Sequence, residues 1–264
     1  MVRRRIDAVL VERGLFPSRE RARAAVLAGE VRVDGRVAHK AGEQVAGDVV
    51  IEVAEKPRYV SRGGEKLAGA LAAFGVNVAG RRAIDVGAST GGFTDCLLQA
   101  GAATVAAVDV GYGQLAWPLR GDERVEVFER TNIRHADPGA LGAPFDLVVV
   151  DVSFISLRTV FAALVGLMGD DADLVALVKP QFEVGKARVG KRGVVKEPRA
   201  HLDALEGVCA VARDAGLIVR AMTFSPIKGP EGNIEFWVWA SRKGTPTTQS
   251  PDEIVAAAHD TLGG

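Results

Sequence analysis

Apolar and polar residues follow helical and strand periods in the first part of the chain. Apolar side chains recur at helical spacing over residues 6–13 and again over 19–28, and Ser18 is placed to cap the second helix. Residues 31–37 alternate around an Asp-Gly pair, which is the strongest short signal for a β-hairpin. Residues 45–53 predict one more strand. This part of the chain therefore predicts a small α+β domain.

The pattern changes further along the chain. Short, strongly apolar runs follow one another, several of them apolar on both faces, and helical patterns lie between most of them. Strands buried on both faces are typical of a mostly parallel sheet covered by helices. The predicted strands are 82–86, 103–110, 125–128, 145–151, 173–178, 217–224 and 234–240. This part therefore predicts an α/β fold with about seven strands.

The join between the two parts is predicted at residues 58–63. The segment around them shows no periodic pattern and contains a proline and paired glycines, which are typical of connections. We therefore expect an N-terminal domain over residues 1–57, a linker over 58–63 and a C-terminal domain over 64–264.

Composition excludes several classes of protein. Of 264 residues, 48% are hydrophobic and 25% are charged, which is typical of a globular protein rather than a disordered or fibrous one. Cys96 and Cys209 lie far apart, and they predict neither a disulfide framework nor a metal site. Because no run of about 18 apolar residues and no signal peptide is found, we expect a cytoplasmic protein with no membrane partner.

Charge is balanced over the whole chain but not locally. Lys and Arg number 33 and Asp and Glu number 33, so an anionic partner would have to be met by local patches. The first 23 residues carry seven arginines against three acidic residues. A second basic segment, residues 182–198, contains three glycines and suits a phosphate backbone. A merely solvated face is the alternative for both segments.

A glycine-rich turn is the most informative stretch of the chain. Residues 83–94 read Ala-Ile-Asp-Val-Gly-Ala-Ser-Thr-Gly-Gly-Phe-Thr, a strand that runs into a turn and then a helix. Glycines there let the backbone approach a ligand closely. The order is neither the dinucleotide fingerprint nor a phosphate-binding loop. Asp109, at the tip of the next strand, is placed to accept two ribose hydroxyls, so the pattern predicts a nucleoside cofactor, and S-adenosylmethionine matches it.

The candidate cofactor-binding residues cluster at the ends of the first four predicted strands. Asn132 is included because adenine contacts normally lie near the end of the third strand. The full set is Asp85, Gly87, Ser89, Thr90, Gly91, Gly92, Phe93, Asp109, Asn132 and Asp151. A tight turn without a ligand is the structural alternative.

Charged residues interrupt the apolar strand ends at Asp151, Lys179 and Glu235. Burying a charge is costly unless it is paired, so each of them belongs either to a structural ion pair or to a site. All three lie near the carboxyl edge of the predicted sheet, where open α/β sheets bind ligands. Lys66 lies just before this fold, at the start of a predicted helix.

Three resemblances give these patterns a context. Residues 3–53 resemble the S4 RNA-binding domain, through the segments 15–19 and 28–35. The order Lys66, Asp151, Lys179, Glu235 resembles the K-D-K-E tetrad of FtsJ-like ribose 2'-O-methyltransferases. Nearly the entire chain is similar to the TlyA family, historically labelled haemolysin A, and the match is carried by residues 87–94, 151–157 and 178–183.

This resemblance implies a Rossmann-like class I methyltransferase domain of about seven strands, preceded by a small α+β S4 domain. It implies S-adenosylmethionine-dependent 2'-O-methylation of cytidine in 16S or 23S ribosomal RNA, or in both, with 30S and 50S ribosomal subunits as partners. Lys66, Asp151, Lys179 and Glu235 would be catalytic, and Lys179 would act either as a base or as a steering group. The implied RNA-binding residues are Arg3, Arg4, Arg5, Arg19, Arg21, Arg23, Arg62, Lys186, Arg188, Lys191 and Arg192.

Aromatic residues suggest a further role at the RNA. Tyr59, Trp117 and Phe154 are candidates for stacking on an extruded base, with core packing as the alternative.

Other functions remain as alternatives. One is an inactive RNA-binding assembly factor, against which the complete tetrad and the intact glycine turn argue. Another is a pore-forming haemolysin, which is disfavoured because the sequence shows no spanning helix and no strongly amphipathic cationic helix.

Overall fold

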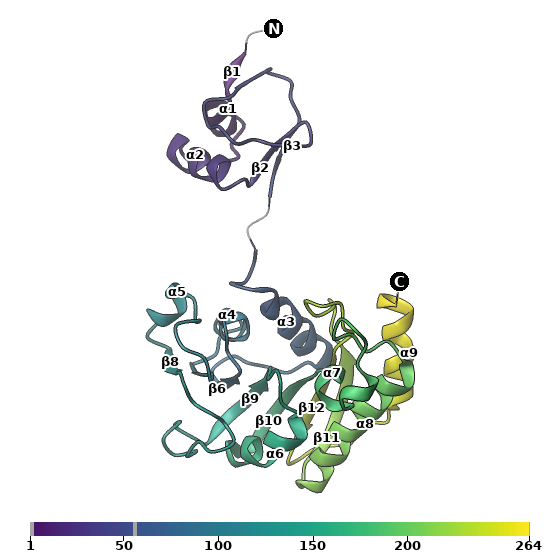
Figure 1. Ribbon diagram of the computed structural model, residues 1–264. Coiled ribbons are helices and arrows are strands. Elements are labelled where there is room, and N and C mark those ends of the chain that lie inside the picture. The colour runs from purple at the N-terminus through teal and green to yellow at the C-terminus, as the bar shows by residue number, and fades with distance from the viewer. Residues whose placement is uncertain (1–2, 55–56, 264) are drawn as a thin grey trace. The chain divides into compact units, whose positions relative to one another are not determined.

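The computed structural model describes residues 3–54 and 57–263 and divides into two compact units, Met1–Pro57 and Arg58–Gly264. Each unit has its own hydrophobic core. Figure 1 shows the helices and strands of both.

The first unit is a small α+β fold. Its elements are β1 (Arg4–Arg5), α1 (Ile6–Glu12), α2 (Arg19–Leu27), β2 (Val31–Val33), β3 (Arg36–Val37), β4 (Gln44–Val45) and β5 (Ile51–Val53). β2 pairs antiparallel with β3 and β5, and β1 pairs with β4. Asp34 and Gly35 both have positive φ, which suits a two-residue hairpin turn, so the predicted hairpin is confirmed. Ser18 caps α2 by accepting a hydrogen bond from the Arg21 N–H, as expected.

The single strand predicted over 45–53 is wrong. β4 ends at Val45 and β5 begins only at Ile51, because residues 47–48 form a turn between them. The Val50 N–H then bonds to Asp34 Oδ1 at 2.9 Å, which fastens this segment to the hairpin turn.

The second unit is an α/β fold around one large sheet. Its elements are α3 (Arg62–Phe74), β6 (Arg82–Val86), α4 (Gly92–Gln99), β7 (Thr104–Val108), α5 (Trp117–Arg120), β8 (Val125–Phe128), β9 (Phe145–Val150), α6 (Leu157–Gly166), β10 (Met168–Val178), α7 (Pro180–Glu183), the 3-10 helix η1 (Lys186–Arg188), α8 (Pro198–Asp214), β11 (Ile218–Phe224), β12 (Phe236–Ser241) and α9 (Pro251–Leu262). The prediction of about seven strands is confirmed.

Strand order determines which residues meet at one edge. The sheet runs β11-β12-β10-β9-β6-β7-β8, and β12 is antiparallel to both of its neighbours while the other pairs are parallel. The carboxyl ends of β6, β7, β9 and β10 therefore lie at the same edge as the beginning of β12. This edge is where open α/β sheets bind ligands.

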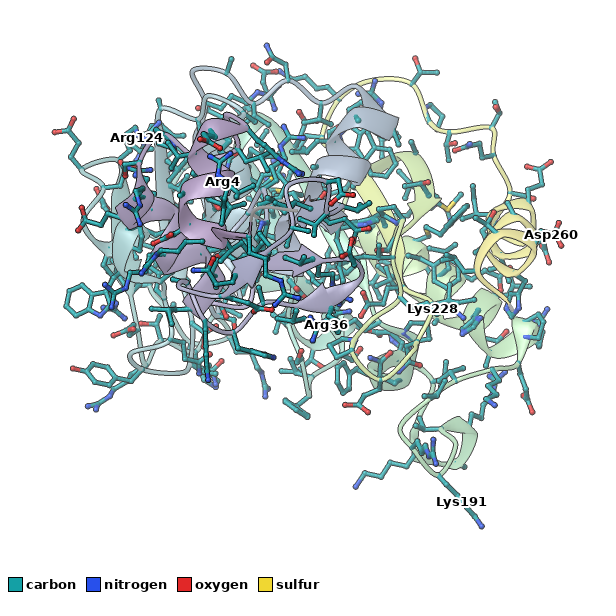
Figure 2. All side chains as sticks on the ribbon, turned by 90° about the horizontal axis from the view of Figure 1, so that it is seen from above. Arg4, Arg36, Arg124, Lys191, Lys228 and Asp260 are labelled. Atoms are coloured by element: carbon teal, nitrogen blue, oxygen red, sulfur yellow. The ribbon has the colours of Figure 1, made fainter. Side chains whose placement is uncertain are left out.

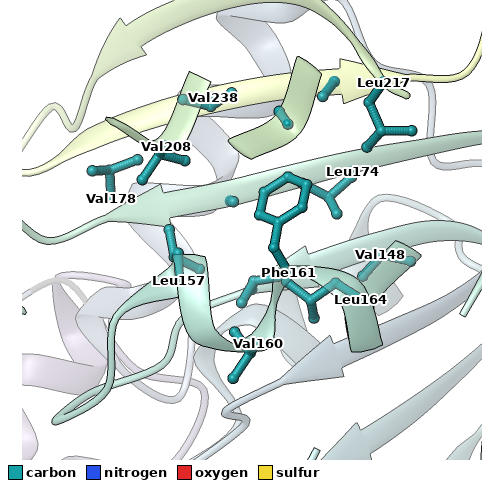
Figure 3. Close-up of a cluster of buried hydrophobic side chains, with 14 of the residues drawn as sticks. Val148, Leu157, Val160, Phe161, Leu164, Leu174, Val178, Val208, Leu217 and Val238 are labelled. Atoms are coloured by element: carbon teal, nitrogen blue, oxygen red, sulfur yellow. The ribbon is translucent and has the colours of Figure 1, made fainter. Parts of the chain in front are cut away.

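Helices cover both faces of the sheet. Apolar side chains of α3, α4 and α5 pack on one face, and those of α6, α8 and α9 pack on the other (Figure 1). On the second face, Phe161 of α6 is completely enclosed in a cluster that includes Leu174 of β10 (Figure 3). Burying one such side chain stabilises a fold by about 1.5–3 kcal/mol. The sheet edge that carries the charged residues is thus held by a rigid frame.

The segment expected to be a linker packs onto the second unit. Tyr59 is only 4% exposed, and the Val60 N–H donates to Asp95 at 2.8 Å. The Gln99 amide donates to the Arg58 carbonyl at 2.9 Å, and Ser61 caps α3. Residues 58–63 are therefore an integral part of the second unit rather than an open connection, and Tyr59 is not available to stack on a base.

Candidate active site

The glycine-rich turn joins β6 to α4, and its backbone conformation would be strained for residues other than glycine. Gly87 and Gly91 have φ values of 92° and 97°, in the left-handed region that favours glycine. A Cβ on Gly87 would also meet the backbone carbonyl oxygen of Asp151. The ends of β6 and β9 therefore approach closely, and Ser89 and Thr90 are left exposed at the tip of the turn.

Asp109 follows β7 and holds this turn from the side. Its Oδ2 accepts a hydrogen bond from the Ser89 N–H at 2.8 Å, and its Oδ1 accepts one from the Gly111 N–H at 2.6 Å. Each carboxylate oxygen keeps a further lone pair for a ligand hydroxyl. Asp109 also lines a small hollow, together with Ala88, Val127 and other residues of this corner.

Asn132 does not line that hollow. Its side chain instead accepts a hydrogen bond from the Arg134 N–H at 3.1 Å. Glu129 lies in the hollow in its place and accepts from the Gly113 N–H at 2.7 Å. Sequence reasoning missed Glu129, although its position directly after β8 was the available signal.

Asp85 lies under the glycine turn and is fully buried. Its Oδ2 accepts from both the backbone N–H and the hydroxyl of Thr94, at 2.9 and 2.7 Å, which ties β6 to the first turn of α4. Its Oδ1 has no hydrogen-bond partner among the described residues. Burial raises the pKa of Asp85 to about 7, against the lowering effect of the Thr94 hydrogen bonds.

Four charged side chains form two ion pairs at the same sheet edge. Lys66 Nζ of α3 lies 2.6 Å from Glu235 Oε2, just before β12, and both side chains are almost completely buried. Lys179 Nζ, directly after β10, lies 2.5 Å from Asp151 Oδ1, directly after β9, and both side chains are partly exposed. Burial raises the pKa of Glu235, while the nearby Lys66 and Lys179 ammonium groups lower it.

A cleft of about 270 Å³ brings the glycine turn and the charged residues together. Gly87, Ser89, Thr90, Gly92 and Phe93 line one part of it. Lys66, Asp151 and Lys179 line another part, with Ser61, Arg62 and Pro230 at its walls. Glu235 is absent from this lining and lies behind Lys66, so it orients that lysine rather than facing the cleft.

Ser153 is a neighbour of Lys179 that the sequence reasoning did not single out. Lys179 Nζ donates a hydrogen bond to Ser153 Oγ at 2.8 Å. The signal was its place two residues after Asp151, at the same strand end. Phe154 follows with φ of 65°, is 92% exposed, and its ring lies 5.4 Å from that of Phe182. An exposed aromatic ring therefore stands beside the group that anchors Lys179.

The predicted RNA-binding arginines of the first unit are exposed, but several are engaged in ion pairs. Arg5 and Arg19 both pair with the buried Asp7, at 2.8 and 3.2 Å, and Arg5 holds the pKa of Asp7 down to about 2. Arg4 pairs with Glu12. Arg3, Arg21 and Arg23 are exposed as well. The paired arginines keep more than two fifths of their side chains exposed, so a ligand can still reach them.

The basic segment of the second unit lies between α7 and α8. Lys186, Lys191 and Arg192 are exposed, whereas Arg188 lies 2.5 Å from Asp203 of α8. Figure 2 shows Lys191 at the far end of a loop that projects away from its neighbours. Arg62 is also exposed, at the wall of the cleft.

These residues fit a nucleoside cofactor better than a metal ion. Within the described parts of the chain, no cluster of three or more His, Cys, Asp or Glu side chains could hold a metal. Asp109 offers acceptors for ribose hydroxyls, and the open backbone of the turn suits a ligand that comes close to it. Asp85, a predicted cofactor-binding residue, is fully buried and does not line the cleft, so in this structure it supports the turn through Thr94.

Comparisons with known proteins agree with this geometry. The model of the FtsJ-like methyltransferase family matches residues 59–242, and that of the S4 domain matches residues 4–51. TlyA of Mycobacterium tuberculosis, named a 16S/23S rRNA (cytidine-2'-O)-methyltransferase, is 52% identical over 90% of this chain and 89% of its own. YqxC of Bacillus subtilis, named as a candidate rRNA methyltransferase, is 47% identical over 98% of this chain and 95% of its own.

A solved structure is similar over the entire length. A hemolysin candidate from Streptococcus thermophilus covers 100% of this chain and 98% of its own, with 43% identity and a TM-score of 0.76. Fold and site together define a Rossmann-like methyltransferase joined to an S4 domain. The chain belongs to the FtsJ-like methyltransferase family and, within it, to the TlyA group.

Over residues 3–54 and 57–263, no helix has both the length and the apolar character needed to cross a bilayer.

Proposed function

We propose that this enzyme transfers a methyl group from S-adenosylmethionine to the ribose 2'-hydroxyl of cytidine in 16S and 23S ribosomal RNA, working in the cytoplasm on 30S and 50S subunits. The observation that carries the proposal is the cleft in which Lys66, Asp151 and Lys179 face the glycine turn. The identity with a relative named for this reaction on both RNAs supports the choice of substrate.

Residues of the turn would hold the cofactor. Asp109 would accept the ribose hydroxyls, and the backbone at Gly87, which lines the cleft, would approach the methionine part. S-adenosylmethionine supplies an electrophilic methyl group when bound. Lys179 lines the same cleft as the glycine turn, so it would lie near a cofactor bound there.

The charged residues would position the acceptor. Lys66, Asp151 and Lys179 would hold the 2'-oxygen in line with the methyl group, which the bound cofactor would supply while retaining the electron pair of its carbon–sulfur bond. The proton of the hydroxyl passes to the Lys179–Asp151 pair and from there to water. A methyl sulfonium is already a good electrophile, so alignment of the hydroxyl is the larger part of the catalysis. Glu235 orients Lys66, and Lys66 forms part of the cleft wall against which the ribose would lie.

RNA would be held by both units. Exposed arginines of the first unit, including Arg21 and Arg23, suit phosphate contacts, as does the basic loop of the second unit. Phe154 is the aromatic residue best placed to stack on a base turned out toward Lys179, because it is exposed and follows Ser153 directly. Trp117 is exposed as well but lies at the start of α5.

The test is transfer of labelled methyl from S-adenosylmethionine to purified 30S and 50S particles. We expect an alkali-resistant 2'-O-methyl cytidine in both particles with the wild type and none with Lys179→Ala. Lys243→Ala serves as the matched control, because that exposed lysine pairs with Asp171 near the other end of β10. Cofactor binding without transfer to either particle would contradict the proposed substrate, and failure to bind the cofactor would contradict the proposed reaction.

A further inference from the structure

A second hollow lies outside the cleft. It measures about 890 Å³ and is lined by residues 188–197, by the segment 228–234 and by the end of α9. We call it the basic recess, because five cationic side chains line it: Arg188, Lys191, Arg192, Lys196 and Lys228. The acidic side chains in its lining are Glu197 and Glu231, and Arg188 is paired with Asp203 of α8, so the recess still carries an excess of positive charge.

A buried amide holds the inner wall of the recess in place. Asn233, which is 1% exposed, accepts a hydrogen bond from the Val195 N–H and donates one to the Gly193 carbonyl, both at 2.9 Å. The Gly229 N–H in turn bonds to the Asn233 carbonyl at 2.9 Å. The root of the basic loop is therefore fastened to the segment before β12, and only the tip of the loop projects (Figure 2).

Two histidines complete the inner wall. His201 of α8 is fully buried. Its Nδ1 lies 2.8 Å from His259 Nε2 of α9, and its Nε2 lies 3.1 Å from the Val195 carbonyl oxygen. These contacts join α8, α9 and the loop at one point. The cationic side chains therefore extend from a preformed wall, and less conformational entropy of the backbone is lost when a ligand binds.

The recess and the cleft share a wall. Pro230 lines the cleft, whereas Lys228, Glu231 and Gly232 of the same short segment line the recess. The segment leads directly into Glu235, which orients Lys66. A polymeric ligand bound in the cleft would therefore reach the recess by passing over residues 228–232.

Lining chemistry identifies the ligand class. The described lining of the recess contains no Phe, Tyr or Trp side chain, and its fully buried His201 bonds to His259 and to the Val195 carbonyl, so cationic groups dominate the surface that a ligand would meet. Lysine and arginine side chains without aromatic partners bind phosphates without reading sequence. The volume exceeds that of the cleft several-fold and leaves room for more than one phosphate group.

We propose that the basic recess binds the phosphate backbone of the RNA strand next to the nucleotide whose ribose occupies the cleft. This inference rests on the proposed function, which supplies the RNA as substrate. It adds Lys196 and Lys228 to the RNA-contacting residues, and it makes Asn233 a positioning residue for the whole loop.

The first test measures binding of a short single-stranded RNA of mixed sequence to the full-length protein over a range of salt concentrations. For Lys196→Ala/Lys228→Ala we expect affinity to fall about tenfold, and we expect the slope of log affinity against log salt to shrink by about 0.7 for each phosphate that is no longer neutralised. Lys243→Ala is the matched control and should leave both quantities unchanged. The cofactor affinity of each variant reports whether its cleft is intact. Wild-type affinity and slope in the double variant would overturn the proposal.

The second test examines Asn233 and keeps all five cations. Asn233→Ala should weaken RNA binding while its affinity for S-adenosylmethionine stays that of the wild type, and amide hydrogen exchange at residues 193–195 should accelerate. Faster exchange with unchanged RNA affinity would show that the loop is not part of the RNA site.

The third test places the strand. A photo-crosslinker attached to Lys191→Cys should join to nucleotides adjacent to the methylated cytidine in 30S or 50S particles. Crosslinks confined to distant RNA would overturn the inference while methyl transfer by the wild type still stood. Conversely, lack of methyl transfer to any particle, with salt-dependent RNA binding still weakened in the double variant, would count against the proposed function and not against the recess.

Discussion

The two ion pairs of the site differ in how far water reaches them, and this difference divides their roles. Lys66 and Glu235 are 7% and 1% exposed in their side chains, whereas Lys179 and Asp151 are 11% and 21% exposed. A buried charge that loses its partner is strongly destabilising, while a partly solvated one is less so. The first pair therefore supports the frame of the cleft, and the second pair is available to substrate.

A substitution at Lys66 should thus affect stability as well as activity. Lys66→Met removes the hydrogen-bonded counter-charge of the buried Glu235 carboxylate and leaves only the more distant Lys179, and we expect it to lower the free energy of unfolding by about 3–5 kcal/mol. Lys66→Met/Glu235→Met removes both charges and should recover most of that loss without recovering methyl transfer. Urea unfolding followed by tryptophan fluorescence measures the stability of each variant. Equal stability of the wild type and Lys66→Met would show that the pair is not a structural element.

Ser153 offers a finer test of how Lys179 is held. Ser153→Ala removes the acceptor that lies 2.8 Å from Lys179 Nζ, so the ammonium is no longer fixed between two groups. We expect kcat to fall about tenfold, equivalent to about 1.4 kcal/mol, while KM for RNA changes little. Ser153→Thr retains the hydroxyl and should restore most of kcat. A rise in KM with kcat unchanged would instead assign Ser153 to RNA binding.

At the scale of elements, Asp85 joins the end of β6 to the start of α4 through Thr94. Burial raises its pKa from an ordinary 3.8 to about 7, so the folded protein binds this proton more tightly than the unfolded chain does. The stabilisation from the bound proton is fully present below about pH 4 and is lost as pH rises to about 7. Asp85 should thus contribute less to the stability of the fold in neutral solution than in mild acid.

Asp85→Asn should remove this dependence. Between about pH 5 and pH 8, the free energy of unfolding of the variant should fall less than that of the wild type, as measured by urea unfolding at each pH. Asp122→Asn is the control, because its arginine neighbour lowers the pKa of Asp122 to about 2 and the group stays ionised throughout this range. Parallel pH profiles for Asp85→Asn and the wild type would contradict the assignment.

Elements with a strong local pattern could be predicted, and those settled by distant contacts could not. The Asp34-Gly35 hairpin and the seven strands of the second unit follow from short-range signals. The strand expected over 45–53 is divided by the turn at residues 47–48. After this turn the Val50 N–H donates a hydrogen bond to Asp34, a residue 16 positions away. Residues 58–63 lack a period of their own, and their docking depends on Asp95 and Gln99 of α4.

The same distinction applies to the site. Strand ends locate Asp109, Asp151 and Lys179, since parallel strands finish at one edge. Glu129 rather than Asn132 lines the hollow, and this depends on how the chain turns after β8, which no periodic pattern encodes. Which charges pair with which is likewise decided by the three-dimensional arrangement of the elements.

On the scale of the whole molecule, the two units have separate cores. Ile6, Leu10 and Val26 belong to the core of the first unit, which is small, and small domains are only marginally stable. All three tryptophans, Trp117, Trp237 and Trp239, lie in the second unit. Circular dichroism should therefore report on both units, and tryptophan fluorescence on the second unit alone.

We expect circular dichroism to show two steps in urea, and tryptophan fluorescence to follow only the second. Ile6→Ala creates a cavity in the first core and should move only the step that fluorescence does not detect, by about 2–5 kcal/mol. Transitions that coincide in both signals would show instead that the units unfold together.

The Lys66–Glu235 pair also has a consequence for how the enzyme is made. It joins residues 169 positions apart, and β12, which Glu235 precedes, must insert between β10 and β11. Contacts of such long range form late, because the intervening chain must be closed first. While the protein is being synthesised, a nascent chain that already contains the glycine turn, Asp151 and Lys179 still lacks the carboxylate that sets Lys66. The role proposed for Lys66 in methyl transfer would therefore be filled only after residue 235 has been synthesised and has folded against α3.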